Sequence, residues 1–128
     1  MSSEVIGTRP LVALVEDDAS IRESLPDLLL ELGVAVRVFS SAEALLASDG
    51  IADMACLIAD IGLPGMTGFD LMHELRVRGH DTPMIFMTGQ TDAALRQRLM
   101  ESEAVTTLFK PFPEKALLEA IVTALAQR

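Results

Sequence analysis

The chain has little cysteine, few aromatic residues and a shortage of positive charge, and each scarcity excludes a class of protein. Its 128 residues include one cysteine, Cys56, and no tryptophan or tyrosine. One cysteine cannot form a disulfide within the chain, and its place in an apolar run predicts a small buried side chain. Lysine and arginine number 10 against 19 aspartates and glutamates, a net charge of −9. We therefore expect no direct nucleic acid binding by this chain, because a surface for the phosphate backbone needs clustered positive charge.

Long hydrophobic runs are also missing. No apolar stretch approaches the ~18 residues of a membrane span, and residues 1–10 lack the basic start and apolar run of a secretory signal. These features predict a cytoplasmic protein that makes no membrane contact. Hydrophobic residues make up 50% of the chain, enough for one core. We expect a single domain over residues 1–128, with an ordered core at about 9–127.

Strand and helix signals alternate five times along the chain. Short apolar runs predict buried strands, and stretches with one apolar stripe predict helices between them. The alternation indicates an α/β fold with a parallel sheet and right-handed crossovers. The expected strands are 11–16, 34–39, 54–59, 83–88 and 105–109, and the expected helices lie near 19–32, 41–48, 68–78, 92–102 and 113–126.

The polarity of the strands predicts their order. The first, third and fourth runs are apolar nearly throughout, so these strands should be central. The second contains Arg37 and the fifth contains Thr106 and Thr107, which is typical of edge strands with one wetter side. The order 2-1-3-4-5 satisfies both conditions and is the flavodoxin-like arrangement, a three-layer sandwich with helices on both faces.

Two pairs of residues have the spacing of a helix capping box. Ser20 with Glu23, and Ser40 with Glu43, predict the starts of the first and second helices. Pro26 lies inside the first helix and removes a hydrogen bond there, so we expect a bend near Arg22 to Pro26, with no functional role.

Charged residues follow three of the apolar runs. Glu16 and Asp17 follow the first, Asp60 follows the third, and Lys110 ends the fifth. Because the carboxyl ends of parallel strands meet at one edge, where ligands bind in such folds, these residues should converge. Carboxylates packed together repel each other unless a cation lies among them, and sites with only oxygen ligands favour Mg²⁺. We expect a magnesium site formed by Glu16, Asp17 and Asp60.

The same edge has the groups that phosphoryl transfer needs. The carboxylate of Asp60 is a potential nucleophile toward phosphorus. The ammonium of Lys110 can pair with a phosphoryl oxygen, and the hydroxyl of Thr88, which ends the fourth run, can donate a hydrogen bond to the same group. Phosphoryl transfer depends mostly on positioning and charge neutralisation, which these side chains would supply.

Four motifs together make the chain resemble the receiver domain of two-component response regulators, across essentially its whole length. Each motif alone is weak, but the set in this order is highly specific. The matching segments are Val-Glu-Asp-Asp at 15–18, Asp-Ile-Gly-Leu-Pro-Gly-Met-Thr-Gly at 60–68, Met-Thr-Gly at 87–89 and Phe-Lys-Pro-Phe at 109–112.

The resemblance implies a role for each matched position. Asp60 would accept a phosphoryl group from a histidine of a sensor kinase or phosphotransfer protein. Asp17 would be a more direct Mg²⁺ ligand than Glu16, and the backbone carbonyl of Gly62 would complete the ligands. Such a domain is a signalling phosphoacceptor rather than an enzyme, since it catalyses only its own phosphorylation and dephosphorylation.

The resemblance also implies an output surface. Thr88 would be the switch hydroxyl and Lys110 the salt-bridging lysine, whose bond to Pro111 is often cis in this family. In the family, phosphorylation reshapes the face made by the fourth helix, fifth strand and fifth helix, which then binds a downstream partner or pairs with itself.

One position of this chain departs from the family pattern, and two others bear on the rate of phosphoryl loss. Thr107 stands three residues before the lysine, where the family usually places an aromatic residue. Phe109 lies on the same side of the strand by alternation, and we expect a modified or weaker output change. Gly62 and Gln90 occupy positions that influence how fast the phosphoryl group is lost: Gly62 has no side chain to orient water, whereas Gln90 could position one.

Two other functions would suit the same kind of site or fold, but the residues favour neither. Phosphatases with a nucleophilic aspartate commonly need a second acid two residues later, where this chain has Gly62. A flavin or dinucleotide carrier on the same fold would need a Gly-x-Gly-x-x-Gly loop after the first strand, where this chain is acidic. The sequence also leaves open a stand-alone regulator or the receiver part of a longer transcription regulator.

Overall fold

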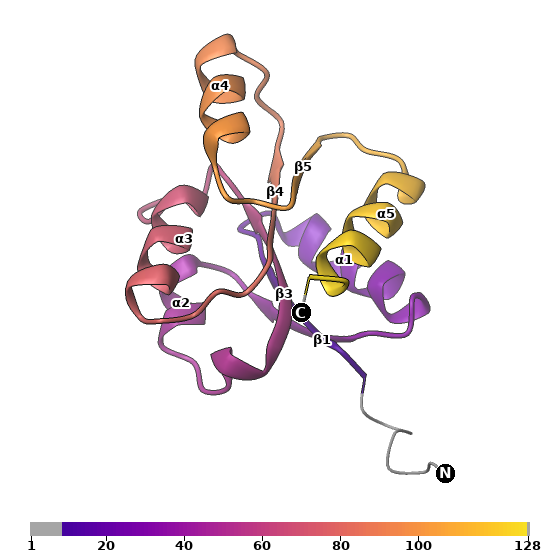
Figure 1. Ribbon diagram of the computed structural model, residues 1–128. Coiled ribbons are helices and arrows are strands. Elements are labelled where there is room, and N and C mark those ends of the chain that lie inside the picture. The colour runs from indigo at the N-terminus through magenta and orange to yellow at the C-terminus, as the bar shows by residue number, and fades with distance from the viewer. Residues whose placement is uncertain (1–8, 128) are drawn as a thin grey trace, which may run out of the picture.

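The computed structural model describes residues 9–127, which form five strands, five α-helices and one 3₁₀ helix (Figure 1). The elements follow one another in strict alternation, as the sequence predicts. They are β1 Leu11–Val15, α1 Ala19–Glu31, β2 Ala35–Phe39, α2 Ala42–Leu46, η1 Ile51–Asp53, β3 Met54–Asp60, α3 Gly68–Val77, β4 Met84–Thr88, α4 Ala93–Glu101, β5 Thr106–Phe109 and α5 Glu114–Leu125.

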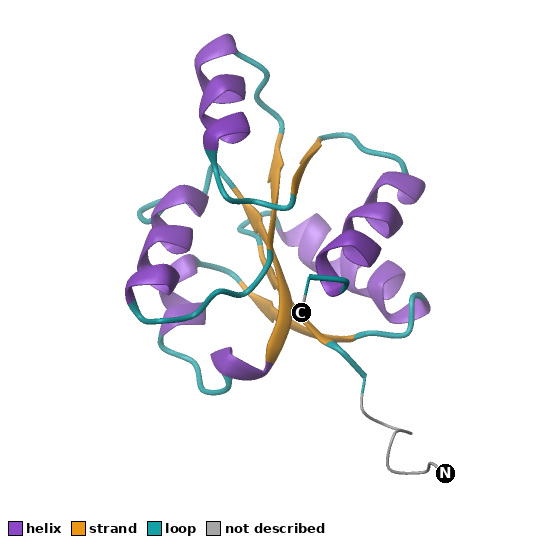
Figure 2. Ribbon diagram, in the orientation of Figure 1, coloured by secondary structure: helices purple, strands orange, loops and turns teal. Residues whose placement is uncertain are grey.

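The strands form one parallel sheet in the order β2-β1-β3-β4-β5. Figure 2 shows this sheet between two layers of helices. The predicted flavodoxin-like three-layer fold is therefore confirmed, and so are the two edge strands. β3 is central and its first six residues are buried, whereas β2 carries Arg37 and the half-exposed Val38.

Each face of the sheet has its own hydrophobic core. One core joins the sheet to α2, α3 and α4 through residues such as Leu45, Leu71 and Leu99. The other joins it to α1 and α5 and contains Leu29, Leu117 and the single cysteine. Cys56 is buried as predicted, and burial raises the pKa of its thiol to about 12.

Both predicted capping boxes at the first two helices are wrong in detail. The cap of α1 is Asp18, whose Oδ1 accepts a hydrogen bond from the Ser20 amide at 2.8 Å. The cap of α2 is Ser41, whose Oγ accepts from the Ala44 amide at 3.0 Å. A cap residue needs extended backbone, which the spacing of serine and glutamate does not reveal. α1 continues through Pro26 to its last residue, and the bend remains a prediction.

The register of the strands brings their carboxyl ends to one level. Ala59 lies opposite Val15 of β1, Asp60 lies opposite Met87 of β4, and Thr88 lies opposite Phe109 of β5. The residues after these strands therefore share one edge of the sheet. Within residues 9–127, no helix is long and apolar enough to cross a membrane.

Candidate functional site

Glu16 is fixed in place at the carboxyl end of β1. Its side chain is 0% exposed, and its backbone amide extends the strand by donating to the Phe39 carbonyl at 3.1 Å. Its carbonyl accepts from Nη1 of Arg22 in α1 at 3.0 Å, and its Oε2 accepts from the Asp18 amide at 3.1 Å. The backbone and the carboxylate of Glu16 are thus held from three sides.

The ammonium of Lys110 links Glu16 to Asp60. Its Nζ donates to Oε1 of Glu16 at 2.9 Å and to Oδ2 of Asp60 at 2.8 Å. Its backbone amide donates to the Thr88 carbonyl at 2.8 Å, which ties the residue after β5 to the end of β4. The ends of several strands therefore meet at one charged cluster, as the parallel sheet predicts.

Glu16, Asp17 and Asp60 also present carboxylate oxygens that lie within 4.8 Å of one another. Asp17 is exposed and Asp60 is partly buried, so the cluster opens to solvent on the Asp17 side. A set of oxygen donors with one open side fits Mg²⁺, which prefers oxygen ligands and retains some of its water.

Burial and hydrogen bonding shift two pKa values in this cluster. Burial raises the pKa of Glu16 above its ordinary value of 4.5, and the hydrogen bond from Lys110 offsets only part of that effect. Burial alone would lower the pKa of Lys110, but its hydrogen bonds with Asp60 and Glu16 outweigh burial and the pKa is raised. Lys110 therefore keeps its proton, and the buried carboxylate of Glu16 would be further stabilised by a cation.

The remaining predicted residues, Gly62 and Thr88, lie in the loop after Asp60 and at the end of β4. The amide of Gly62 donates to Oδ1 of Asp60 at 3.0 Å, so both carboxylate oxygens of Asp60 have partners. Thr88 is 2% exposed at the end of the neighbouring strand, and its Oγ1 accepts from the Gln90 amide at 3.0 Å. The Lys110–Pro111 bond is cis, as the resemblance implies.

Thr107, which stands where the family usually has an aromatic residue, borders a groove. Thr107 and Phe109 line a cavity of about 420 Å³ between β5 and α4, together with Arg96 and Met100 of α4. The guanidinium of Arg96 lies over the Phe109 ring, 4.9 Å from its centroid. An aromatic side chain is thus present on this side of β5, two residues later than in the family pattern.

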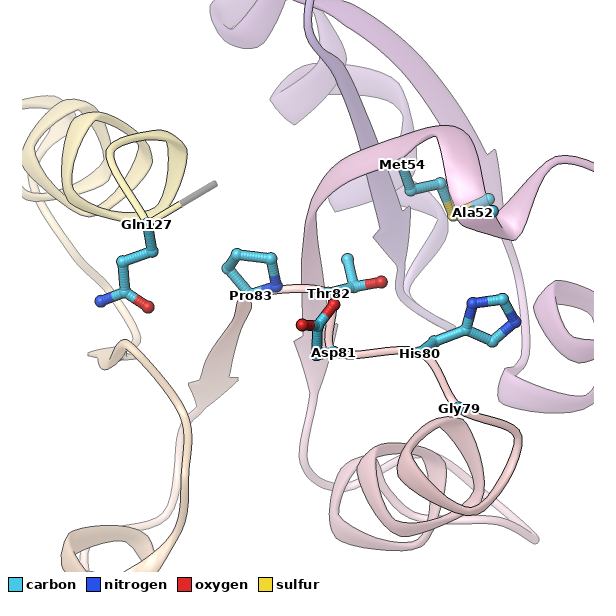
Figure 3. A pocket seen from close by; sticks show the side chains of 8 residues that line it. All are labelled: Ala52, Met54, Gly79, His80, Asp81, Thr82, Pro83 and Gln127. Atoms are coloured by element: carbon cyan, nitrogen blue, oxygen red, sulfur yellow. The ribbon is translucent and has the colours of Figure 1, made fainter.

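A different cavity lies at the opposite edge of the sheet. It has a volume of about 450 Å³ and is lined by residues at the amino ends of β3 and β4, among them Met54, His80 and Thr82 (Figure 3). No predicted site residue lines it. The predicted site residues lie at the carboxyl edge instead, in a charged cluster that is open to solvent.

Sequence reasoning missed two residues that contact this site. Arg22 donates to the Glu16 carbonyl, and Glu43 of α2 accepts from the amide of Met66 in the loop after Asp60, at 3.3 Å. The only sequence signal for Glu43 was its spacing from a serine, which indicated a cap instead.

Comparisons with known proteins agree with this geometry. The family model described as "Response regulator receiver domain" matches residues 12–122. Nodulation protein W of Bradyrhizobium diazoefficiens is 40% identical over 117 residues, which cover 91% of this chain and 52% of that protein. The transcriptional regulatory protein FixJ of Azorhizobium caulinodans is 36% identical over 116 residues, which cover 91% of this chain and 55% of that protein. The chain therefore spans about half the length of these relatives.

Solved structures give the same result. Response regulator StyR superposes with a TM-score of 0.84 at 36% identity, over 94% of this chain and 61% of that one. Chemotaxis protein CheY4 of Vibrio cholerae gives 0.82 at 28% identity, over 92% of this chain and 100% of that one. The family match, the relatives and the shared fold lead to one conclusion: the chain belongs to the response regulator receiver domain family of two-component systems.

Proposed function

We propose that Asp60 is a phosphoacceptor, which takes a phosphoryl group from a phosphohistidine of a sensor kinase or phosphotransfer protein in a Mg²⁺-dependent reaction. The observation that carries this proposal is the ammonium of Lys110, held 2.9 Å from Glu16 and 2.8 Å from Asp60 beside a cluster of three carboxylates. Such a cluster places one positive charge and a cation site around one nucleophilic oxygen.

Glu16, Asp17, Asp60 and the backbone carbonyl of Gly62 would hold the metal. Bound Mg²⁺ would neutralise negative charge on the transferred phosphoryl group. An oxygen of Asp60 forms the new bond to phosphorus as the bond from phosphorus to the histidine nitrogen breaks, and the bonding pair stays on the imidazole, which takes a proton. Lys110 is already beside the carboxylate and would pair with a phosphoryl oxygen, while Glu16 keeps it oriented.

The phosphorylated Asp60 would act on the rest of the domain through Thr88. The Thr88 hydroxyl would exchange its contact with the Gln90 amide for one with the phosphoryl group, and the α4–β5–α5 face would rearrange with it. That face would bind a downstream partner or a second copy. Its two helices carry exposed apolar side chains that support such a role, namely Met100, Leu118 and Val122.

The relatives indicate which kind of protein the α4–β5–α5 face would act in. FixJ is named a transcriptional regulatory protein, and the matched segment covers 55% of its length. Within this proposal we therefore favour the receiver part of a longer transcription regulator over a stand-alone regulator. The downstream partner of the α4–β5–α5 face would then be another segment of the same regulator or a second receiver.

The test uses acetyl phosphate and the phosphoryl mimic beryllofluoride. Phosphate-affinity gel electrophoresis should show a Mg²⁺-dependent shifted species for the wild type and none for Asp60→Asn. Beryllofluoride with Mg²⁺ should move backbone amide signals of the wild type at Thr88 and along β5, and leave those of the variant unchanged. Asp81→Asn is the matched control, because Asp81 is an exposed aspartate at the opposite edge of the sheet. An Asp60→Asn variant that still takes up phosphoryl would refute the assignment.

A further inference from the structure

We infer that Glu43 is a positioning residue for the phosphoacceptor: its carboxylate fixes the loop after Asp60, so that Gly62 and Asp60 are already arranged before a cation or phosphoryl group arrives. The inference rests on the proposed function, and it concerns a residue of α2, an element that contributes none of the proposed ligands.

Glu43 does not complete a capping box at the start of its own helix. Ser41 is the cap of α2, and its hydroxyl satisfies the Ala44 amide at 3.0 Å. The position that would complete a capping box is therefore Ala44, one residue after Glu43. The Glu43 carboxylate reaches across to the β3–α3 loop instead, where Oε2 accepts from the Met66 amide at 3.3 Å, 23 residues along the chain.

The Glu43 carboxylate lies close to the loop backbone. A Cβ atom added to Gly65 would lie 3.0 Å from Oε2 of Glu43. Gly65 also has a φ of +77°, a conformation that side chains disfavour. Glycine at this position thus lets the loop turn and lets the carboxylate approach it.

The rest of the loop is held at both of its ends. Its first residues are tied to the site by the Gly62 amide, which donates to Asp60 at 3.0 Å. Its end is fixed by the capping box of α3, in which Thr67 and Asp70 bond each other's backbone amides. Between these two points, the Glu43 side chain fastens the backbone at the Met66 amide. α2 and α3 pack against each other, which keeps Glu43 at this distance (Figure 1).

A loop held at three points has less freedom to lose when its first residues bind a cation. The ordering is then completed on folding rather than on binding, which favours both cation binding and the reactive geometry. Removing one hydrogen bond of this kind should weaken Mg²⁺ binding about two- to tenfold.

Three variants test the inference. Glu43→Ala removes the acceptor, whereas Glu43→Gln keeps an oxygen that can accept from the Met66 amide. Glu114→Ala is the matched control, because Glu114 is also an exposed first-turn glutamate, in α5. The measurements are the solvent exchange rate of the Met66 amide by nuclear magnetic resonance without metal, and the Mg²⁺ dissociation constant by calorimetry.

Glu43→Ala should speed exchange of the Met66 amide and weaken Mg²⁺ binding, Glu43→Gln should restore most of both, and Glu114→Ala should change neither. A wild-type exchange rate in Glu43→Ala, or Mg²⁺ binding equally weakened by Glu114→Ala, would overturn the inference. Failure of the proposed function gives a different pattern, in which the wild type itself neither binds Mg²⁺ nor takes up phosphoryl.

Discussion

The two helices that flank β5 are attached to the domain very differently. α5 buries four side chains, those of Leu117, Ala120, Ile121 and Ala124, whereas α4 buries only Leu99. Met100 of α4 is 81% exposed. Figure 1 shows α4 projecting at the top of the view, while α5 lies beside α1. Both helices belong to the proposed output face, but α5 is anchored in a hydrophobic core whereas α4 is held by few buried contacts.

The difference matters because the charged cluster spans both kinds of environment. Glu16 and Asp60 lie at the ends of β1 and β3 in the middle of the sheet, and the strand residues before them are almost all buried. Thr88 and Lys110 lie at the ends of β4 and β5, the strands next to α4. Under the proposed function, a group added at Asp60 would therefore displace α4 more readily than α5, since segments with few buried contacts move at the lowest free-energy cost.

Truncating one leucine in each helix should give the largest difference. Leu117→Ala should lower the free energy of unfolding by about 3 kcal/mol, because it removes a fully buried side chain and leaves a cavity. Leu99→Ala should lower it by less, about 2 kcal/mol, because Leu99 already borders the groove between α4 and β5. Urea unfolding followed by circular dichroism measures both. Equal losses would mean that α4 is as firmly packed as α5, and the contrast between the two helices would be lost.

Removing the Lys110 ammonium, which links the end of β5 to Glu16 and Asp60, should have the next largest effect on stability. Lys110→Met should lower the free energy of unfolding by about 2 kcal/mol without Mg²⁺, because the buried carboxylate of Glu16 loses its cation. Mg²⁺ should then stabilise the variant more than the wild type, since it binds without the nearby ammonium.

The control for this change is Lys115→Met, which removes an exposed lysine from the first turn of α5. Thermal unfolding with and without Mg²⁺ compares the three proteins. If Lys110→Met and Lys115→Met lose the same stability, or if Mg²⁺ stabilises all three equally, the Lys110 ammonium is not balancing the carboxylates.

The fold was predictable because the polarity of each strand reflects its place in the sheet. β3 is apolar up to its last residue and is central, while Arg37 and Thr107 mark the two edge strands. Helix ends were less predictable, because a capping box depends on which residue has extended backbone. Asp18 and Ser41 have it, whereas the serine–glutamate spacing indicated residues 20 and 40.

The convergence of Glu16, Asp60 and Lys110 was predictable for a related reason: residues at the carboxyl ends of parallel strands share an edge. The contact of Glu43 with Met66 was not, because it depends on how α2 packs beside α3 and on the turn at Gly65. Local sequence patterns predict the features that backbone direction determines, whereas contacts between packed helices and loops depend on side-chain positions in three dimensions.

The smallest predicted effect concerns the contacts that hold α4 in place. Its two arginines each lie over an aromatic ring of a neighbouring element: Arg96 over Phe109 of β5 at 4.9 Å, and Arg98 over Phe69 of α3 at 3.9 Å. Since such contacts at exposed sites stabilise by about 0.5–1 kcal/mol, either alanine variant should lower the free energy of unfolding by about 0.5 kcal/mol.

The two variants should nevertheless differ in how they change the output face. Arg96→Ala removes the contact of α4 with Phe109 of β5, so hydrogen exchange in α4 should quicken and the beryllofluoride-induced shifts at Phe109 should change. Arg98→Ala loosens the contact with α3 and should leave the Phe109 shifts as in the wild type. One outcome is that both variants change the beryllofluoride-induced shifts at Phe109 to the same extent. That result would mean that each arginine contact restrains α4 as a whole, and that the Arg96–Phe109 contact has no special role. If only Arg96→Ala does, the aromatic residue two positions beyond Thr107 is the link between the charged cluster and the loosely held helix.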